Sequence, residues 1–487
     1  MVWTAALKAG IIYQGIFMDK KPTDRRRRSG RHSLRGKAAD NRLAGRLPRN
    51  AAPIEVTISH IGGRGDGVGR GQYTHNYVES DYDIFVPASL PGEQVLVQPL
   101  NLSRQGIKAR IIELKTASPD RRPARCSAFP ACGGCSFQHW DERRISSWKQ
   151  DLVSHFLDRA GISAVIIRPP HISPPYSRRR ASLHLKRLAD DAIVGFQERS
   201  GQHIVRPADC AILHPALLAL QHSIETFATT HLPAGFIADI HANILFGANH
   251  SAGQLCVYIE TAGDMTPPLT GVMPYLVEWA SAAGIARLTI NDAHGPVTIY
   301  APETPTQLFG SVAVSPPPGA FLQATRDGEA ALQAAVGEIV GGASRIADLF
   351  AGCGTLSLPL LDNLAGLIAA EADGPSLAAL KAGADAAGLG GRVTIIERNL
   401  FDAPLLPDEL AQCDAVIIDP PRSGAAAQCQ QLANTSIDHI AMVSCNPASF
   451  ARDAAILTAG GFTLSWVQPV DQFSFSNHLE LVGAFHR

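Results

Sequence analysis

The last third of the chain alternates short apolar runs with glycine-rich turns and helical stretches. Each of five apolar segments has the length of a buried strand: 345–350, 365–370, 393–397, 415–418 and 440–444. Alanine-rich helical stretches, such as 376–387, separate several of them. Because this alternation is typical of parallel sheets covered by helices, it predicts a doubly wound, Rossmann-like α/β domain over residues 319–487. Two further β-like runs, 462–467 and 479–485, predict a closing antiparallel pair.

The front of the chain has a different pattern. Residues 53–116 contain short alternating apolar and polar runs, with glycines crowded between 62 and 71. We interpret the glycine-rich stretch as turns and the whole segment as an OB-like β-barrel, a common scaffold for oligonucleotide binding. Residues 117–318 mix helical and strand patterns and are predicted to form a central α+β domain. Residues 1–52 are predicted to be a disordered basic tail, with either RNA-backbone contact or no sequence-specific role.

Composition and charge narrow the possible functions. The 487 residues are 46% hydrophobic, which is enough for several packed domains, and no apolar run reaches 18 residues, so no membrane span is expected. The net charge of −1 divides into +15 for residues 1–200 and −16 for residues 201–487. A basic front half predicts a polyanion-binding module. The odd number of cysteines and the lack of a secretory pattern predict a cytoplasmic protein.

Three strand ends in the α/β domain carry polar groups where ligands bind in such sheets. The first motif, Asp348-Leu-Phe-Ala-Gly-Cys-Gly-Thr355, is followed by Glu371 at the end of the next strand, which predicts either a nucleotide-like cofactor site or an ordinary tight turn. Asp419 precedes two prolines that stop its strand, which indicates a ligand contact or a capping turn. Cys445, in the segment Val-Ser-Cys-Asn-Pro, is a candidate nucleophile, although most single cysteines are buried packing residues.

A carboxylate lies in the last apolar run. Glu480 follows His478 and Leu479 and would be costly to bury without a task. It is therefore a candidate catalytic base. The alternation of the segment also permits the carboxylate to face water.

Two patterns in the basic half indicate binding chemistry. Cys126, Cys132 and Cys135, with Cys210 farther along, have the spacing of metal ligands, and four thiolates could hold zinc or a [4Fe–4S] cluster. The segments 176–180 and 195–203 combine arginines with aromatic residues. Such a surface binds the RNA backbone and stacks bases, unless it is only a solvated basic face.

These motifs, in this order, resemble the bacterial RNA (uracil-5-)-methyltransferase family, which uses S-adenosylmethionine to make 5-methyluridine. The resemblance covers about residues 53–487 and is most similar to the 23S rRNA type. It implies an RNA-binding TRAM domain at the front and a [4Fe–4S] cluster on Cys126, Cys132, Cys135 and Cys210. Phe321-Leu-Gln323 resembles a family segment whose glutamine reaches the cofactor and the target base.

The resemblance also assigns roles within the α/β domain. It implies that Cys445 is the nucleophile, that Glu480 is the base, and that the S-adenosylmethionine site contains Gln323, Phe350, Thr355, Glu371, Asn399 and Asp419. The family often has asparagine where this chain has Thr355, which is a departure at that contact. The implied reaction adds the cysteine to C6 of uracil, methylates C5, removes the C5 proton and expels the cysteine.

Other functions predict different features. A tRNA uridine-5-methyltransferase would share the same catalytic set, whereas a non-catalytic iron–sulfur RNA-binding protein would not need Cys445 with Glu480. An N-methyltransferase would form no covalent RNA adduct. A redox enzyme would need a second redox group, and we find no flavin or nicotinamide fingerprint. We therefore expect a monomeric, cytoplasmic RNA methyltransferase that acts on rRNA rather than tRNA.

Overall fold

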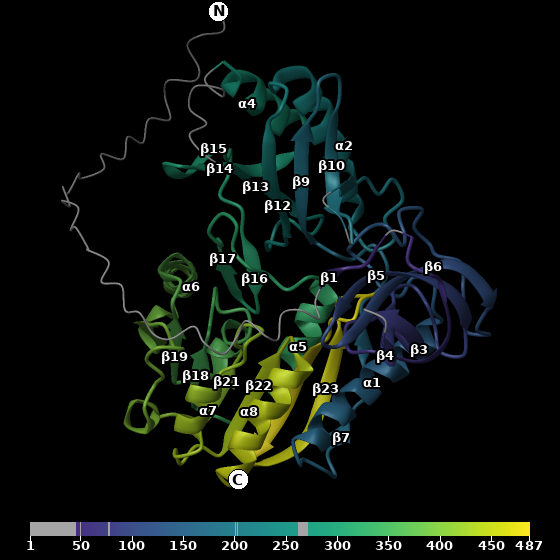
Figure 1. Cartoon of the computed structure of the whole chain (residues 1–487). Coiled ribbons are helices and arrows are strands. Elements are labelled where there is room, and N and C mark those ends of the chain that lie inside the picture. The colour runs from purple at the N-terminus through teal and green to yellow at the C-terminus, as the bar shows by residue number, and fades with distance from the viewer. Residues whose placement is uncertain (1–44, 49, 76–77, 200, 202, 262–270) are drawn as a thin grey trace, which may run out of the picture.

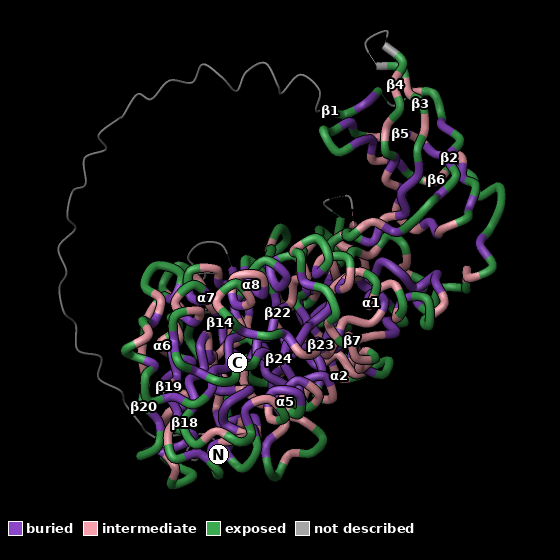
Figure 2. Tube along the Cα trace, turned by 90° about the horizontal axis from the view of Figure 1, so that it is seen from below, coloured by how far each residue is buried: buried purple, intermediate pink, exposed green. Residues whose placement is uncertain are grey.

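The computed structural model describes residues 45–487 except 49, 76–77, 200, 202 and 262–270. Most of the predicted basic tail lies outside the described residues. The described chain forms a β-barrel, a central α+β unit and an α/β unit with a large sheet (Figure 1). In the view of Figure 2 the barrel projects from the rest of the molecule, and buried residues run through the interior of the main body. No helix in the described ranges is long and apolar enough to cross a membrane.

The front unit is a barrel closed by antiparallel and parallel pairing. Strands β2, β3, β4, β6 and β5 pair in that circular order, and β1 adds to β5. Its core contains apolar residues of β2, β4, β5 and β6 together with Leu47, and Tyr73 of β3 packs against it. The strands are β1 (Gly45–Arg46), β2 (Ile54–Ile61), β3 (Gly67–His75), β4 (Val78–Val86), β5 (Gln94–Ser103) and β6 (Gly106–Thr116).

The glycine-rich segment of the barrel corrects the sequence interpretation. Residues 67–71, the end of the stretch 62–71 that we predicted to be rich in turns, belong to the strand β3. A Cβ atom on Gly69 would lie 2.4 Å from the Thr57 carbonyl oxygen and from Val56 Cγ1. Glycine is therefore required at this position because neighbouring strands approach closely, which a turn-based interpretation of glycine does not anticipate.

The central unit is a seven-stranded sheet in the order β11-β10-β9-β12-β13-β14-β15. Helices α2 and α4 contribute to its apolar core. A separate hairpin, β16–β17, leads towards the α/β unit. The elements are β9 (Arg180–Arg187), β10 (Ala192–Gln197), β11 (Ile204–Val205), α2 (Pro215–His231), β12 (Ile237–Leu245), β13 (Gln254–Thr261), α4 (Met273–Ala282), β14 (Ile285–Asp292), β15 (Gly295–Tyr300), β16 (Gln307–Phe309) and β17 (Val312–Val314).

The α/β unit contains the order β20-β19-β18-β21-β22-β24-β23, with β24 antiparallel to its neighbours. Apolar residues of α5 and α6 belong to one core cluster and those of α1, α7 and α8 to another, so helices cover both faces. The elements are β18 (Arg345–Leu349), β19 (Gly366–Glu371), β20 (Val393–Glu397), β21 (Ala415–Ile418), β22 (His439–Ser444), β23 (Thr463–Asp471), β24 (Glu480–His486), α5 (Arg326–Val340), α6 (Gly374–Ala386), α7 (Ala426–Leu432) and α8 (Pro447–Ala459).

Residues from the middle of the chain complete this sheet. The short strands β7 (Ile166–Ile167) and β8 (His171–Ile172) both pair with β23. Helix α1 (Glu142–Arg159) precedes them, and its buried Lys149 forms a 2.6 Å ion pair with Asp471 at the end of β23. The segment between the barrel and the central sheet is therefore built into the α/β unit.

Candidate active site

The carboxyl ends of β18 and β21 form the point where the strand order reverses, the usual ligand crevice of a doubly wound sheet. The loop after β18 turns sharply, because Phe350, Gly352 and Gly354 all have positive φ angles. A Cβ on Gly354 would lie 2.6 Å from Leu358 Cγ, so only glycine fits there. The loop's backbone is anchored by the Phe350 and Ala351 N–H groups, which donate to the Ala370 carbonyl.

Three carboxyl groups gather at this crevice. Asp348, buried near the end of β18, and the half-buried Asp419, directly after β21, both have a pKa raised to about 7 by desolvation and by nearby carboxylates. Glu371, at the end of β19, accepts hydrogen bonds from the N–H groups of Gly352, Ala372 and Asp373 at 2.6–3.1 Å. Asp348 Oδ2 has no hydrogen-bond partner in the described chain. Clustered carboxyls with an unpartnered oxygen favour a cationic ligand with polar hydrogens.

Three other predicted cofactor residues lie at the same edge of the sheet, Phe350 and Thr355 in the loop after β18 and Asn399 two residues after β20. The ring of Phe350 lies 5.4 Å from that of Phe401. The Thr355 carbonyl accepts a 2.8 Å hydrogen bond from Gln333 on α5. Asn399 follows β20 and hydrogen-bonds locally to Asp402 and Phe401. We did not predict a cofactor contact for Asp348, although its place at the end of an apolar strand could have indicated one.

The pairing of β22 with β24 brings the two predicted catalytic residues together. Ser444 is the register partner of Leu481, so the next step of the antiparallel ladder places Cys445 beside Glu480. Parallel pairing of Ile418 with Met442 brings Asp419 to the same edge. Three residues that are distant in sequence therefore meet at one end of the sheet.

The surroundings at this edge disfavour the ionised forms of the Cys445 and Glu480 side chains. Burial, with the carboxyls of Glu480 and Asp419, raises the pKa of the Cys445 thiol to about 12, and Arg422 acts in the opposite direction. Glu480 is 4% exposed, and burial together with Asp419 raises its pKa well above the ordinary value. Hydrogen bonding to Gln472 and the charges of Arg180 and Arg422 partly offset this rise.

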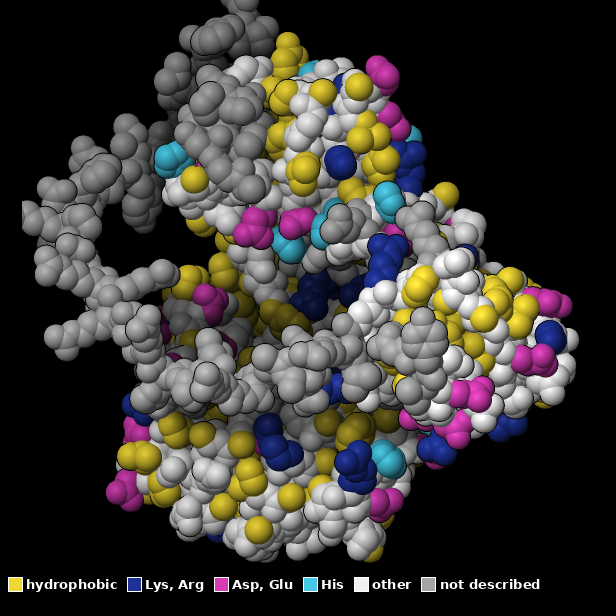
Figure 3. All heavy atoms as spheres, viewed as in Figure 1, with side chains coloured by type: hydrophobic (Ala, Val, Ile, Leu, Met, Phe, Trp, Pro, Cys, Tyr) yellow, Lys and Arg dark blue, Asp and Glu magenta, His cyan; other side chains and the backbone are white. Residues whose placement is uncertain are grey.

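Cys445 and Glu480 line a cavity of about 470 Å³. Its other walls include Arg178, Arg180 and Phe321. The Arg180 guanidinium lies 4.2 Å from the centre of the exposed Phe321 ring. Figure 3 shows the molecule hollowed between its upper and lower parts, with Lys and Arg side chains gathered in the hollow. A cavity with cationic and aromatic walls suits an unstacked nucleobase and its phosphates.

The four predicted metal-ligand cysteines line the same cavity: Cys126, Cys132, Cys135 and Cys210. Burial raises the pKa of Cys135 to about 12, and the neighbouring thiols add to the rise. Two N–H groups point at the sulfurs, from Gly134 to Cys132 at 3.5 Å and from Gln138 to Cys135 at 3.3 Å. In the described ranges no three His, Cys, Asp or Glu side chains are grouped closely enough for a single metal ion.

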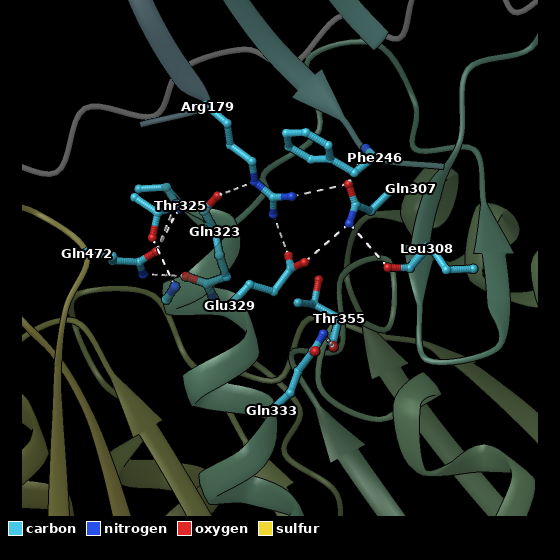
Figure 4. Close-up of polar contacts among 12 residues, drawn as sticks. Arg179, Phe246, Gln307, Leu308, Gln323, Thr325, Glu329, Gln333, Thr355 and Gln472 are labelled. Carbon is cyan, nitrogen blue, oxygen red and sulfur yellow. Dashed lines mark hydrogen bonds and ion pairs between the residues drawn. The ribbon is translucent and has the colours of Figure 1, made fainter. Parts of the chain in front are cut away.

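The arginine-rich segment divides between surface and interior. Arg179, which we grouped with an RNA-binding surface, is 1% exposed and forms a buried ion pair with Glu329 on α5 (Figure 4). That interpretation is wrong for Arg179, because this residue, directly before β9, is buried against α5, whereas Arg178 and Arg180 line the cavity. Arg179 also donates to the Gln323 carbonyl at 3.1 Å and so joins the central unit to the α/β unit.

Fold and site together describe a nucleotide-cofactor enzyme with a cysteine and a carboxylate beside the cofactor crevice. A family model described as tRNA (Uracil-5-)-methyltransferase matches residues 407–486. An uncharacterized RNA methyltransferase of Caulobacter vibrioides is 35% identical over 89% of this chain and 100% of its own length. The chain belongs to the RNA (uracil-5-)-methyltransferase family.

Two further proteins are similar over most of the chain. The 23S rRNA (uracil(1939)-C(5))-methyltransferase of Alteromonas naphthalenivorans is 29% identical over 90% of each chain. The tRNA (uracil-54, C5)-methyltransferase of Pyrococcus abyssi, solved with S-adenosyl-L-homocysteine, is 18% identical with a TM-score of 0.67, covering 88% of this chain and 99% of that one. The second likeness confirms the predicted α/β methyltransferase fold.

Proposed function

We propose that this enzyme methylates C5 of one uridine in RNA, with S-adenosylmethionine as methyl donor and 23S rRNA as substrate. The observation that carries the proposal is the meeting of Cys445 and Glu480 in one cavity at the edge of the cofactor crevice. A structural cysteine or a surface glutamate would not require this juxtaposition. The alternative of a non-catalytic RNA-binding protein leaves the pair unexplained.

The residues define a balanced reaction. Cys445 gives its thiol proton to solvent and adds through its sulfur to C6 of uracil, and the electron pair of the C5–C6 bond moves onto C5 and O4. When bound, the cofactor supplies an electrophilic methyl group to C5. Glu480 then accepts the C5 proton, the C5–C6 double bond re-forms, and the sulfur of Cys445 leaves C6 as a thiolate. The methyl enters as a cation and the C5 proton leaves as one, so the charge balances, and the thiolate of Cys445 regains a proton from solvent.

The cofactor crevice has the chemistry that this reaction requires. Gln323, Phe350, Thr355, Glu371, Asn399 and Asp419 are the residues that we propose to contact the cofactor. Asp348 and Asp419 favour the positively charged sulfonium and amino groups of the cofactor. Glu371 offers carboxylate oxygens that can accept hydrogen bonds from ribose hydroxyls. A cationic group beside Cys445 would also oppose the rise in the pKa of its thiol.

A deletion strain tests the proposed substrate. Loss of the gene should remove one 5-methyluridine from 23S rRNA while tRNA 5-methyluridine stays at its normal level, as measured by mass mapping of each purified RNA. Return of the modification on expression of the intact chain, but not of Cys445→Ala, is the control. Loss of the modification from tRNA alone would assign the enzyme to the alternative substrate.

We further propose that Cys126, Cys132, Cys135 and Cys210 hold a [4Fe–4S] cluster. The support is their common cavity wall, their sulfur chemistry and the N–H groups directed at two of the sulfurs. The front barrel is the proposed TRAM domain, and the predicted boundaries, monomeric state and cytoplasmic location stay predictions.

Iron analysis checks the cluster. Protein purified without oxygen should be brown and contain about four irons per chain, and Cys132→Ala should lose most of them, because the half-buried Cys132 supplies one of the four thiolates. Cys413→Ala, a buried cysteine in the α/β unit, is the matched control and should keep its iron. Stoichiometric zinc without iron would contradict the assignment.

A further inference from the structure

The loop between β23 and β24 forms part of the wall of the reaction cavity. It covers residues 472–479 and runs directly into Glu480, the first residue of β24. Phe473, Ser476 and His478 of this loop line the same cavity as Glu480. The position of the 472–479 loop therefore determines where the proposed base lies.

Phe475 holds the middle of this loop in an unusual backbone conformation. Its φ angle is +61°, a left-handed value that residues with bulky side chains rarely adopt. The N–H groups of Ser136 and Phe137, directly after Cys135, donate to the Phe475 carbonyl oxygen at 2.7 and 2.8 Å. Such a conformation persists where the surrounding structure imposes it, and it is frequent at active sites.

The side chain of Phe475 is a second anchor for the loop. It is 5% exposed and belongs to an apolar cluster with Ile61 of the barrel, Phe137, and Ile145 of α1. These partners come from three separate parts of the chain. Phe475 therefore joins the loop to the barrel, to the segment after Cys135 and to α1 at the same time.

Other contacts hold the two ends of the loop. At its start, the Oε1 atom of Gln472 accepts a 2.7 Å hydrogen bond from the N–H group of Ala324, beside the Gln323 contact drawn in Figure 4. Near its end, Asn477 Nδ2 donates to the Gly63 carbonyl of the barrel at 3.3 Å. Phe475 thus fixes the stretch between two supported ends.

The two proposed catalytic residues have different supports. Cys445 follows β22 and precedes α8, whose N-cap residue Asn446 donates to the Arg422 carbonyl at 3.0 Å. Glu480 pairs with Val470 at the loop end of the β23–β24 ladder. Because the end of a ladder frays first when its connection is disturbed, a displaced loop should move Glu480 before it moves Cys445.

We propose that Phe475 is a positioning residue that, through the 472–479 loop, places Glu480 for removal of the C5 proton. This inference rests on the proposed function. Phe475 acts through the loop and is not itself a catalytic residue. Its loss should therefore slow removal of the C5 proton far more than the attack of Cys445 on the base.

Phe475→Ala should accumulate a covalent adduct with ordinary RNA that already carries the methyl group. We expect proton removal to slow roughly 10- to 100-fold, because a misplacement of about 1 Å can lower a rate by about 100-fold. Attachment to saturating 5-fluorouridine RNA, which needs attack and methyl transfer but no proton removal, should slow far less. Denaturing gels followed over time measure both rates, and mass spectrometry identifies the methyl group.

Ile145→Ala is the matched control. Ile145 is 4% exposed in the same apolar cluster but lies on α1, outside the loop. Its truncation should lower the melting temperature without accumulation of the methylated adduct. Phe475→Leu, which keeps a large apolar side chain in the cluster, should restore most of the rate of proton removal. If Phe475→Ala melts below the assay temperature, Phe475→Gly, which adopts a positive φ without strain, replaces it.

The outcomes separate this inference from the proposed function. A wild-type enzyme that forms no adduct with 5-fluorouridine RNA contradicts the proposed function. A wild-type enzyme that forms this adduct, while the Phe475 variant builds up no methylated adduct on ordinary RNA or loses attack and proton removal equally, overturns the role of Phe475 alone.

Discussion

Cys445→Ala is expected to abolish both methyl transfer and covalent attachment to RNA. Its place opposite Glu480 is fixed by the pairing of β22 with β24, and the four other thiols that line the cavity are the proposed cluster ligands. RNA with 5-fluorouridine at the target should trap the wild-type enzyme as a band on denaturing gels, since fluorine at C5 cannot be removed as a proton. The variant should give no band and no 5-methyluridine.

Cys429→Ala supplies the control for general damage, because Cys429 is a buried packing residue on α7. It should retain the trapped band even though its core is less well filled. A trapped band in Cys445→Ala at the wild-type rate would show that another group attacks the base.

Glu480→Gln is expected to stop the reaction after methyl transfer. Attack and methylation precede proton removal, so this variant should accumulate a covalent RNA adduct that already carries the methyl group. Turnover should fall by about 10²–10⁴-fold, the usual contribution of a general base. Denaturing gels would show the adduct, and mass spectrometry would show the methyl. Normal turnover without an adduct would assign the proton to another base.

The same substitution should stabilise the fold at pH values above the folded-state pKa of Glu480. The pKa of Glu480 is higher in the folded than in the unfolded chain, so its contribution to stability is complete at acid pH and is lost as pH rises through the folded value. Glutamine does not ionise. The melting temperature of Glu480→Gln should therefore exceed that of wild type above this pKa, and the difference should shrink in acid. Glu338→Gln, on the exposed face of α5, is the control.

Much of the α/β unit was predictable because its pattern is local. The strands at 393–397 and 415–418 have the predicted bounds, and the antiparallel closing pair is confirmed as β23 and β24. Continuous apolar runs and strand-end acids are visible in sequence because parallel strands are buried on both faces and bind ligands at one edge. The same reasoning places Cys445, Asp419 and Glu480 at that edge.

Features that depend on distant contacts were not predictable. We predicted turns for the glycine-rich first part of β3. Glycine is needed there because β2 approaches closely, and this contact cannot be seen in the neighbouring sequence. Arg179 was grouped with a surface because its partner Glu329 lies 150 residues away.

Peptide mapping of the trapped complex tests the central claim most directly. Wild-type enzyme, S-adenosylmethionine and RNA carrying 5-fluorouridine would be digested with nuclease and protease and analysed by tandem mass spectrometry. The account predicts one modified peptide, with Cys445 bonded to a 5-fluorouridine nucleotide that also bears the transferred methyl group. Attachment at another residue, or formation of 5-methyluridine from ordinary RNA by an enzyme that never yields this adduct, would contradict it.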